Sequence, residues 1–112
     1  MKILFIENHA VFAKTVTSSF LKNYSVDIVP SIKQAEEKLS LAHYDIALVD
    51  YDLDDGKGDQ ITTKINTLYP ETKIIAVSSH SKGNNLILNA GADAICGKME
   101  FQKINNAIAS IL

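Results

Sequence analysis

The chain has 112 residues, the usual size of one domain, and this leaves little room for a second. With 46% hydrophobic residues it can bury an ordinary core, which argues against a disordered chain. The 11 basic and 13 acidic residues give a net charge of -2 without a basic block, so we expect no direct nucleic acid binding by this segment.

Two further features bear on location. No apolar stretch approaches the roughly 20 residues that a membrane helix needs. The only cysteine, Cys96, cannot form an internal disulfide, and it is best explained as a small buried hydrophobic residue. We therefore expect a cytoplasmic protein that makes no membrane contact and forms a single domain over residues 1–112.

The first half of the chain alternates short apolar runs with segments of helical period. The run Ile3–Ile6 predicts a strand, and residues 12–20 then predict a helix with apolar residues at i, i+4 and i+8. The run Val26–Val29 predicts the next strand. A capping box at Ser31 to Gln34 then opens a helix over residues 32–39.

The second half repeats this alternation. Ile46–Val49 and Ile74–Val77 predict strands on either side of a helix over residues 61–68, which Pro70 stops. Because residues 81–85 are poor helix formers, we expect only residues 86–90 to be helical before Gly91. A last strand, Ala94–Cys96, precedes a helix over residues 101–111.

These elements predict an α/β fold with a doubly wound, five-stranded parallel sheet of flavodoxin-like type. Several of the strands are apolar at every position, as expected when helices cover both faces. With the strand order 2-1-3-4-5, ligands bind beyond the carboxyl ends of the strands. Polar residues stand at these ends, and we expect them to converge on one rim: Glu7, Asn8, Asp50, Ser78 and Lys98.

Such a set suits phosphoryl chemistry. A carboxylate can act as a nucleophile toward a phosphoryl group, while a lysine, a hydroxyl and a metal hold the transferring oxygens. Magnesium prefers one or two carboxylates together with phosphate and water. We predict that Lys98 and a divalent metal are the cationic partners of Asp50.

From end to end, the chain resembles a response-regulator receiver domain of the CheY-like superfamily. Asp50 matches the phosphoacceptor, Gly58 the loop glycine, Ser78 the conserved Ser/Thr and Lys98 the invariant lysine. The resemblance implies a two-component signalling domain, not an enzyme, in which Asp50 takes a phosphoryl group from a histidine kinase, a phosphotransfer protein or a small donor.

The resemblance also implies further sites. The metal ligands would be Glu7, Asn8, Asp50 and the main-chain carbonyl of Asp52, and they would hold Mg²⁺ weakly. The signal would pass to an effector domain or a second copy through the face formed by the fourth helix, the fifth strand and the fifth helix. Because a short fourth helix can hardly bury three consecutive apolar residues, we expect one of residues 86–88 to face a partner.

Several positions depart from the family pattern. Asn8 stands where an acid usually binds the metal, and Ile95 stands where an aromatic switch residue is common. Asp54 and Met99 each replace a common proline. These departures keep open a pseudo-receiver that binds a partner without being phosphorylated.

Other residues and classes have less support. Asp52, Asp54 and Asp55 suit a solvated acidic turn, and His9 suits an early-helix position without metal-ligand spacing to another histidine. The stretch Val49–Asp52 also resembles the first motif of haloacid-dehalogenase-type phosphatases, although the acidic pair after the lysine is incomplete. Flavin binding would need a Ser/Thr-rich phosphate loop after the first strand, which is absent.

Overall fold

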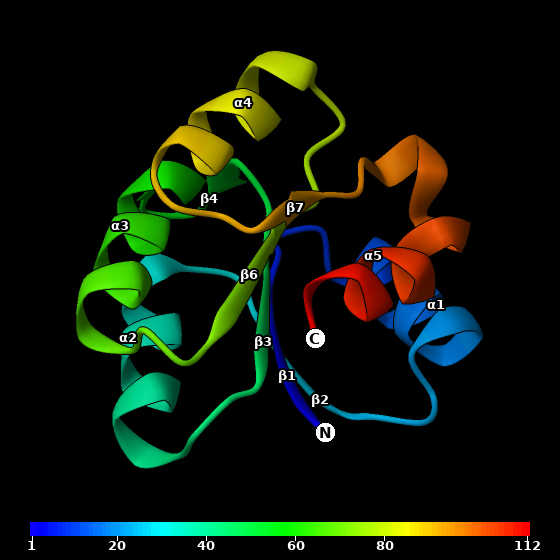
Figure 1. Cartoon of the computed structure of the whole chain (residues 1–112), viewed down its shortest axis with the longest axis horizontal. Coiled ribbons are helices and arrows are strands. Elements are labelled where there is room, and N and C mark those ends of the chain that lie inside the picture. Colours follow the sequence, from blue (N-terminus) through cyan, green and yellow to red (C-terminus); the bar gives the residue numbers. More distant parts are fainter.

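The computed structural model describes residues 1–112 as a central sheet with helices on both faces (Figure 1). The five strands of the sheet are β1 (Lys2–Ile6), β2 (Ser25–Val29), β3 (Ile46–Val49), β6 (Lys73–Ala76) and β7 (Ala94–Ile95). All adjacent strands in this sheet are parallel. Their order, β2-β1-β3-β6-β7, confirms the predicted 2-1-3-4-5 arrangement and the doubly wound fold.

The sheet separates the core into two layers, and helices cover each layer. The helices are α1 (Ala10–Phe20), α2 (Ile32–Leu41), α3 (Gly58–Leu68), α4 (Ser81–Asn89) and α5 (Ile104–Ile111). In Figure 1, α1 and α5 cover one face of the sheet, and α2, α3 and α4 cover the other. Along β1, Phe5 belongs to the α1/α5 layer and Leu4 to the opposite layer, as alternation along a strand requires. The buried strands are therefore apolar at successive positions because both faces are covered.

Local sequence signals explain several boundaries. The Ser31 hydroxyl accepts a hydrogen bond from the Gln34 amide at 3.1 Å, so Ser31 caps α2 as predicted. Helix α3 ends at Leu68, shortly before Pro70, as predicted. Gly91 follows α4 with φ +124°, a conformation that L side chains rarely adopt.

The prediction of a short fourth helix was wrong, since α4 begins at Ser81 rather than at Leu86. The cause is tertiary packing, which overrides weak propensity. Gly83 lies against Tyr51 so closely that an added Cβ would be 2.9 Å from its ring. The buried Asn84 side chain bonds to both the amide and the carbonyl of Ser78, at 2.8 and 2.9 Å. These contacts fix the first turn of α4 where its sequence alone does not.

Two other segments also differ from the prediction. The expected single helix over residues 101–111 is a 3₁₀ segment, η1 (Lys98–Lys103), followed by α5, with Glu100 outside helical geometry at φ -123°, ψ 25°. The acidic stretch after β3 forms a small antiparallel ladder between β4 (Asp52–Leu53) and β5 (Gly56–Lys57). The turn after Asp50 is therefore a two-stranded hairpin that leads directly into α3.

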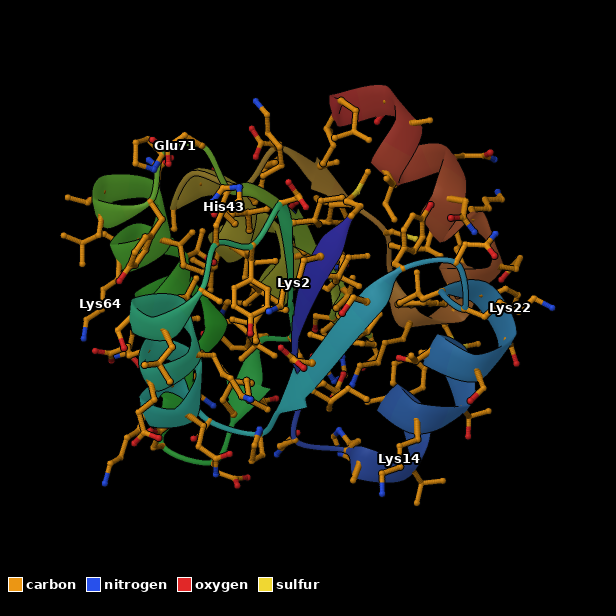
Figure 2. The ribbon with its side chains drawn as sticks, turned by 90° about the horizontal axis from the view of Figure 1, so that it is seen from below. Lys2, Lys14, Lys22, His43, Lys64 and Glu71 are labelled. Carbon is orange, nitrogen blue, oxygen red and sulfur yellow. The ribbon has the colours of Figure 1, made fainter.

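The lysines labelled in Figure 2 do not all lie on one side of the molecule. In Figure 2, which views the sheet edge opposite the carboxyl ends of the strands, Lys14 and Lys22 lie on one side of the molecule and Lys64 on the other. This scatter agrees with the absence of a basic block in the sequence. No helix is both long enough and apolar enough to cross a membrane.

Candidate functional site

The polar residues predicted to converge lie on the rim formed by the carboxyl ends of four strands. Glu7 follows β1, Asp50 follows β3, Ser78 lies just beyond β6, and Lys98 follows β7. Hydrogen bonds between neighbouring strands continue through these residues: the Asp50 amide donates to Ile6 at 3.0 Å and the Lys98 amide to Ser78 at 3.3 Å. The sheet therefore fixes the main-chain position of each of these residues.

A cluster of three charged side chains occupies the centre of the rim. The Lys98 ammonium lies 2.9 Å from Glu7 Oε1 and 3.3 Å from Asp50 Oδ2. The side chains of Glu7 and Asp50 are almost fully buried. Lys98 also lies over the Phe12 ring, 5.0 Å from its centroid, which favours a cation at this place.

The Asp50 carboxyl group is strongly perturbed. Burial, followed by the neighbouring Glu7 carboxylate, raises the pKa of Asp50 from 3.8 to about 6, and the attraction of Lys98 opposes this rise. At pH 7 the group is still mostly ionised and so keeps its lone pairs for nucleophilic attack. A perturbed carboxylate beside a half-buried lysine is typical of functional sites.

Ser78 is buried on the same rim but forms a separate hydrogen-bond group. Its Oγ accepts from the His80 amide at 3.2 Å, and its main chain is held by Asn84. No hydrogen bond joins the Ser78 hydroxyl to Asp50 or Lys98. Asn84 was not predicted, because a polar residue in a weak helix gives no sign that it is buried.

The two remaining predicted metal ligands differ in their surroundings. Asn8 is half-buried, and its Oδ1 is buried without a hydrogen-bond partner. The Asp52 side chain is exposed and forms an ion pair with Lys57, which holds the pKa of Asp52 below its usual range. A role for Asp52 at the rim therefore depends on its main-chain carbonyl and not on its carboxylate.

The description of the acidic turn as merely solvated was incomplete. Besides the pair of Asp52 with Lys57, the Asp55 carboxylate accepts hydrogen bonds from the amides of Ile32 and Lys33, at 2.7 and 3.0 Å. These two amides begin α2, so Asp55 interacts with the positive end of that helix and has a lowered pKa. Asp52 and Asp55 thus have separate cationic and dipolar partners, whereas Asp54 is exposed.

His9 also lies at the rim, a position that the sequence analysis did not predict. It precedes the first residue of α1, and its Nδ1 lies 3.0 Å from Glu7 Oε2 and 3.4 Å from the Lys98 ammonium. Ligand atoms of Glu7, His9 and Asp50 all lie within 4.8 Å of one another. The spacing of His9 to the other histidines gave no sign of this proximity, whereas the contiguous run of Glu7, Asn8 and His9 at a strand end could have indicated it.

A comparison with models of known families identifies the family of the chain. Residues 3–109 match the family model of the response regulator receiver domain.

The chain belongs to the response regulator receiver domain family.

This receiver domain is a signalling module of two-component systems rather than a catalytic enzyme, so the phosphatase interpretation does not hold.

Similar proteins agree with this family. The response regulator protein VraR of Staphylococcus saprophyticus is 24% identical over 99 residues, covering 84% of this chain and 47% of that protein. VraR of Staphylococcus aureus is 25% identical over 99 residues, again covering 84% of this chain and 47% of that protein. The chain therefore spans about half the length of the curated relatives it matches.

Solved structures show the same fold. A CheY-like receiver domain protein from Methanospirillum hungatei has a TM-score of 0.87 and 24% identity, with 98% of this chain and 91% of that one covered. The response regulator TrrA from Thermotoga maritima, solved in complex with Mg²⁺-BeF, has a TM-score of 0.88 and 19% identity, with 99% and 98% covered. At this identity the likeness concerns the fold.

Proposed function

We propose that this receiver domain takes a phosphoryl group on Asp50 and passes the resulting change to a partner. The observation that carries the proposal is the buried Asp50 carboxylate, 3.3 Å from the Lys98 ammonium, on the ligand-binding rim of a receiver fold. An Asp50 oxygen would form the new bond to phosphorus while the bond from phosphorus to the donor breaks. Lys98 would neutralise charge on the phosphoryl oxygens, and the Ser78 hydroxyl would donate a hydrogen bond to one of them.

We propose a divalent cation, Mg²⁺ in the first instance, as the cofactor of this reaction. Two observations support a cation at these residues: Asn8 Oδ1 is buried without a partner, and the Lys98 ammonium lies beside the Glu7 and Asp50 carboxylates. Glu7, Asn8, Asp50 and the Asp52 carbonyl would hold the cation, which supplies positive charge to the transferring oxygens when bound. Because Asn8 brings no charge, we expect binding to be weak.

We propose a histidine kinase or phosphotransfer protein as the donor, and an effector domain or a second copy as the receiver of the signal. The face of α4, β7 and α5 supports the second part, because Leu88 is 38% exposed and Ile95 is 40% exposed. Ile87, which precedes Leu88 in sequence, is fully buried and Leu86 is half-buried, so Leu88 is the most exposed of residues 86–88. We also propose that residues 1–112 act as one domain without direct contact to nucleic acid.

A phosphorylation-independent pseudo-receiver is the second candidate. It is favoured by the uncharged Asn8 at the rim and by the lack of an aromatic side chain at Ile95. Such a domain would use the same exposed face but would keep Asp50 paired with Lys98.

Intact mass after incubation with acetyl phosphate and Mg²⁺ separates the two candidates. We expect the wild type and Asp54→Asn, a change at an exposed acid, to gain one phosphoryl group each, and Asp50→Asn to gain none. Equal gain by Asp50→Asn would overturn the assignment of Asp50. A wild type that gains nothing from acetyl phosphate or from kinases would favour the pseudo-receiver.

A further inference from the structure

The position of His9 is fixed by two contacts with one carboxylate oxygen. Glu7 Oε2 accepts a hydrogen bond from the His9 amide at 3.1 Å and lies 3.0 Å from the ring Nδ1. Both contacts span only two residues and so follow from the local turn between β1 and α1. The His9 side chain is 65% exposed, yet its Nδ1 faces the buried acid rather than water alone. The ring nitrogen is therefore positioned beside the carboxylates before any ligand binds.

Three side chains on this rim already surround one cation. The Lys98 ammonium lies 2.9 Å from Glu7 Oε1, 3.3 Å from Asp50 Oδ2 and 3.4 Å from His9 Nδ1. The ammonium is paired with the two carboxylates, and ligand atoms of Glu7, Asp50 and His9 all lie within 4.8 Å of one another beside it. Two negative charges face one positive charge here, so the set can accept a second positive charge.

The donor set decides which kind of cation fits best. Mg²⁺ prefers oxygen ligands in a strict octahedron, whereas imidazole nitrogen suits the first-row transition ions such as Co²⁺, Ni²⁺ and Zn²⁺. The nearby amide oxygen of Asn8 adds a neutral donor and no charge. His9 Nδ1 lies 3.0 Å from Glu7 Oε2, and a metal ion held by both would use the lone pair of Nδ1, with the ring proton on Nε2.

We infer that His9 is a nitrogen ligand of the rim cation and that it shifts the preference of the site from Mg²⁺ toward divalent transition ions. The inference rests on the proposed function only in that both use the same rim. It extends that function by naming the class of cation that supports the receiver.

Cobalt binding tests the inference directly, because the visible absorption of Co²⁺ responds to a nitrogen ligand. Wild type, His9→Gln and His43→Gln would be titrated with Co²⁺, and with Mg²⁺ in competition. His43 is a matched control: it is an exposed histidine 3.6 Å from a single carboxylate, Asp45, and it lies on the opposite edge of the molecule (Figure 2).

We expect His9→Gln to weaken Co²⁺ binding by at least about tenfold and to change the absorption spectrum, with Mg²⁺ affinity altered by less than about threefold. His43→Gln should match the wild type for both ions. The inference would be overturned if His9→Gln bound Co²⁺ with the same affinity and absorption spectrum as the wild type. It would also be overturned if the wild type did not bind Co²⁺.

A measurement on the wild type alone guards against a variant that folds poorly. The chain has three histidines, and added Zn²⁺ should shift the ¹⁵N resonance of His9 Nδ1 while leaving the ring resonances of His43 and His80 in place. Unchanged His9 resonances would contradict the inference. Neither readout requires phosphorylation, so a failure of Asp50 to accept a phosphoryl group would leave this test intact and would count only against the proposed function.

Discussion

Replacing Asp50 by asparagine should stabilise the metal-free protein at neutral pH. Burial and the Glu7 carboxylate raise the pKa of Asp50 from 3.8 to about 6, so the folded state binds the proton more tightly than the unfolded chain. As pH rises from about 4 to 6, the folded protein must give up a proton that the unfolded chain has already lost. The free energy of unfolding therefore falls across this window and stays lower above it.

The size of the effect follows from the same two pKa values. Their difference is close to two pKa units, and at about 1.4 kcal/mol for each unit the charged Asp50 costs the fold at most about 3 kcal/mol at pH 7.5. Water at the open rim screens part of this cost, so we expect about 2 kcal/mol. Asparagine keeps the size of the side chain and removes the charge, and Glu7 remains as a partner for Lys98.

Urea unfolding from pH 4 to 8 in the presence of a chelator measures this prediction. The free energy of unfolding of Asp50→Asn should exceed that of the wild type by less than about 1 kcal/mol at pH 4 and by about 2 kcal/mol at pH 7.5. Asp54→Asn, at an exposed acid, serves as the control and should show no such growth with pH. The reasoning is refuted if Asp50→Asn is no more stable than the wild type at pH 7.5, or if its advantage is the same at both pH values.

Three further changes test other parts of the account. Asn8→Asp should tighten Mg²⁺ binding by at least about tenfold, because one added charge about 4 Å from the cation contributes on the order of 4 kcal/mol before desolvation. A Mg²⁺ titration that gives equal affinities for the variant and the wild type would contradict this. Asn84→Ala should lower the free energy of unfolding in urea by about 2–4 kcal/mol, because it leaves the buried Ser78 amide unpaired and removes one of the two hydrogen bonds to the Ser78 carbonyl. The exposed Asn85→Ala should change it by less than about 0.5 kcal/mol. Leu88→Lys should leave the stability nearly unchanged and dissociate any dimer in sedimentation, whereas weakened folding with no change in mass would place Leu88 in the core.

The sheet could be predicted from the sequence because its signals are local and strong. Runs such as Ile46–Val49 are apolar at every position, and the order of strands and helices along the chain left few arrangements open. The convergence of Glu7, Asp50 and Lys98 followed from that topology, because parallel strands bring their carboxyl ends to one edge.

The parts that could not be predicted depend on individual packing contacts and on the geometry of one turn. The first turn of α4 is held by Gly83 against Tyr51 and by Asn84 against Ser78, and helix propensity does not include either contact. The position of His9 beside Glu7 depends on the angle at which β1 turns into α1. Periodicity predicts that a helix begins there but not where its first side chain points.

Chemical trapping of the phosphorylated residue tests the central claim most directly. Borohydride reduces an aspartyl phosphate to homoserine, so treating the protein after incubation with acetyl phosphate and Mg²⁺, followed by peptide mass mapping, locates the acceptor by position. The account predicts homoserine at residue 50 in the wild type and none in Asp50→Asn. Homoserine at Asp52, Asp54 or Asp55 instead, with residue 50 unmodified, would contradict it.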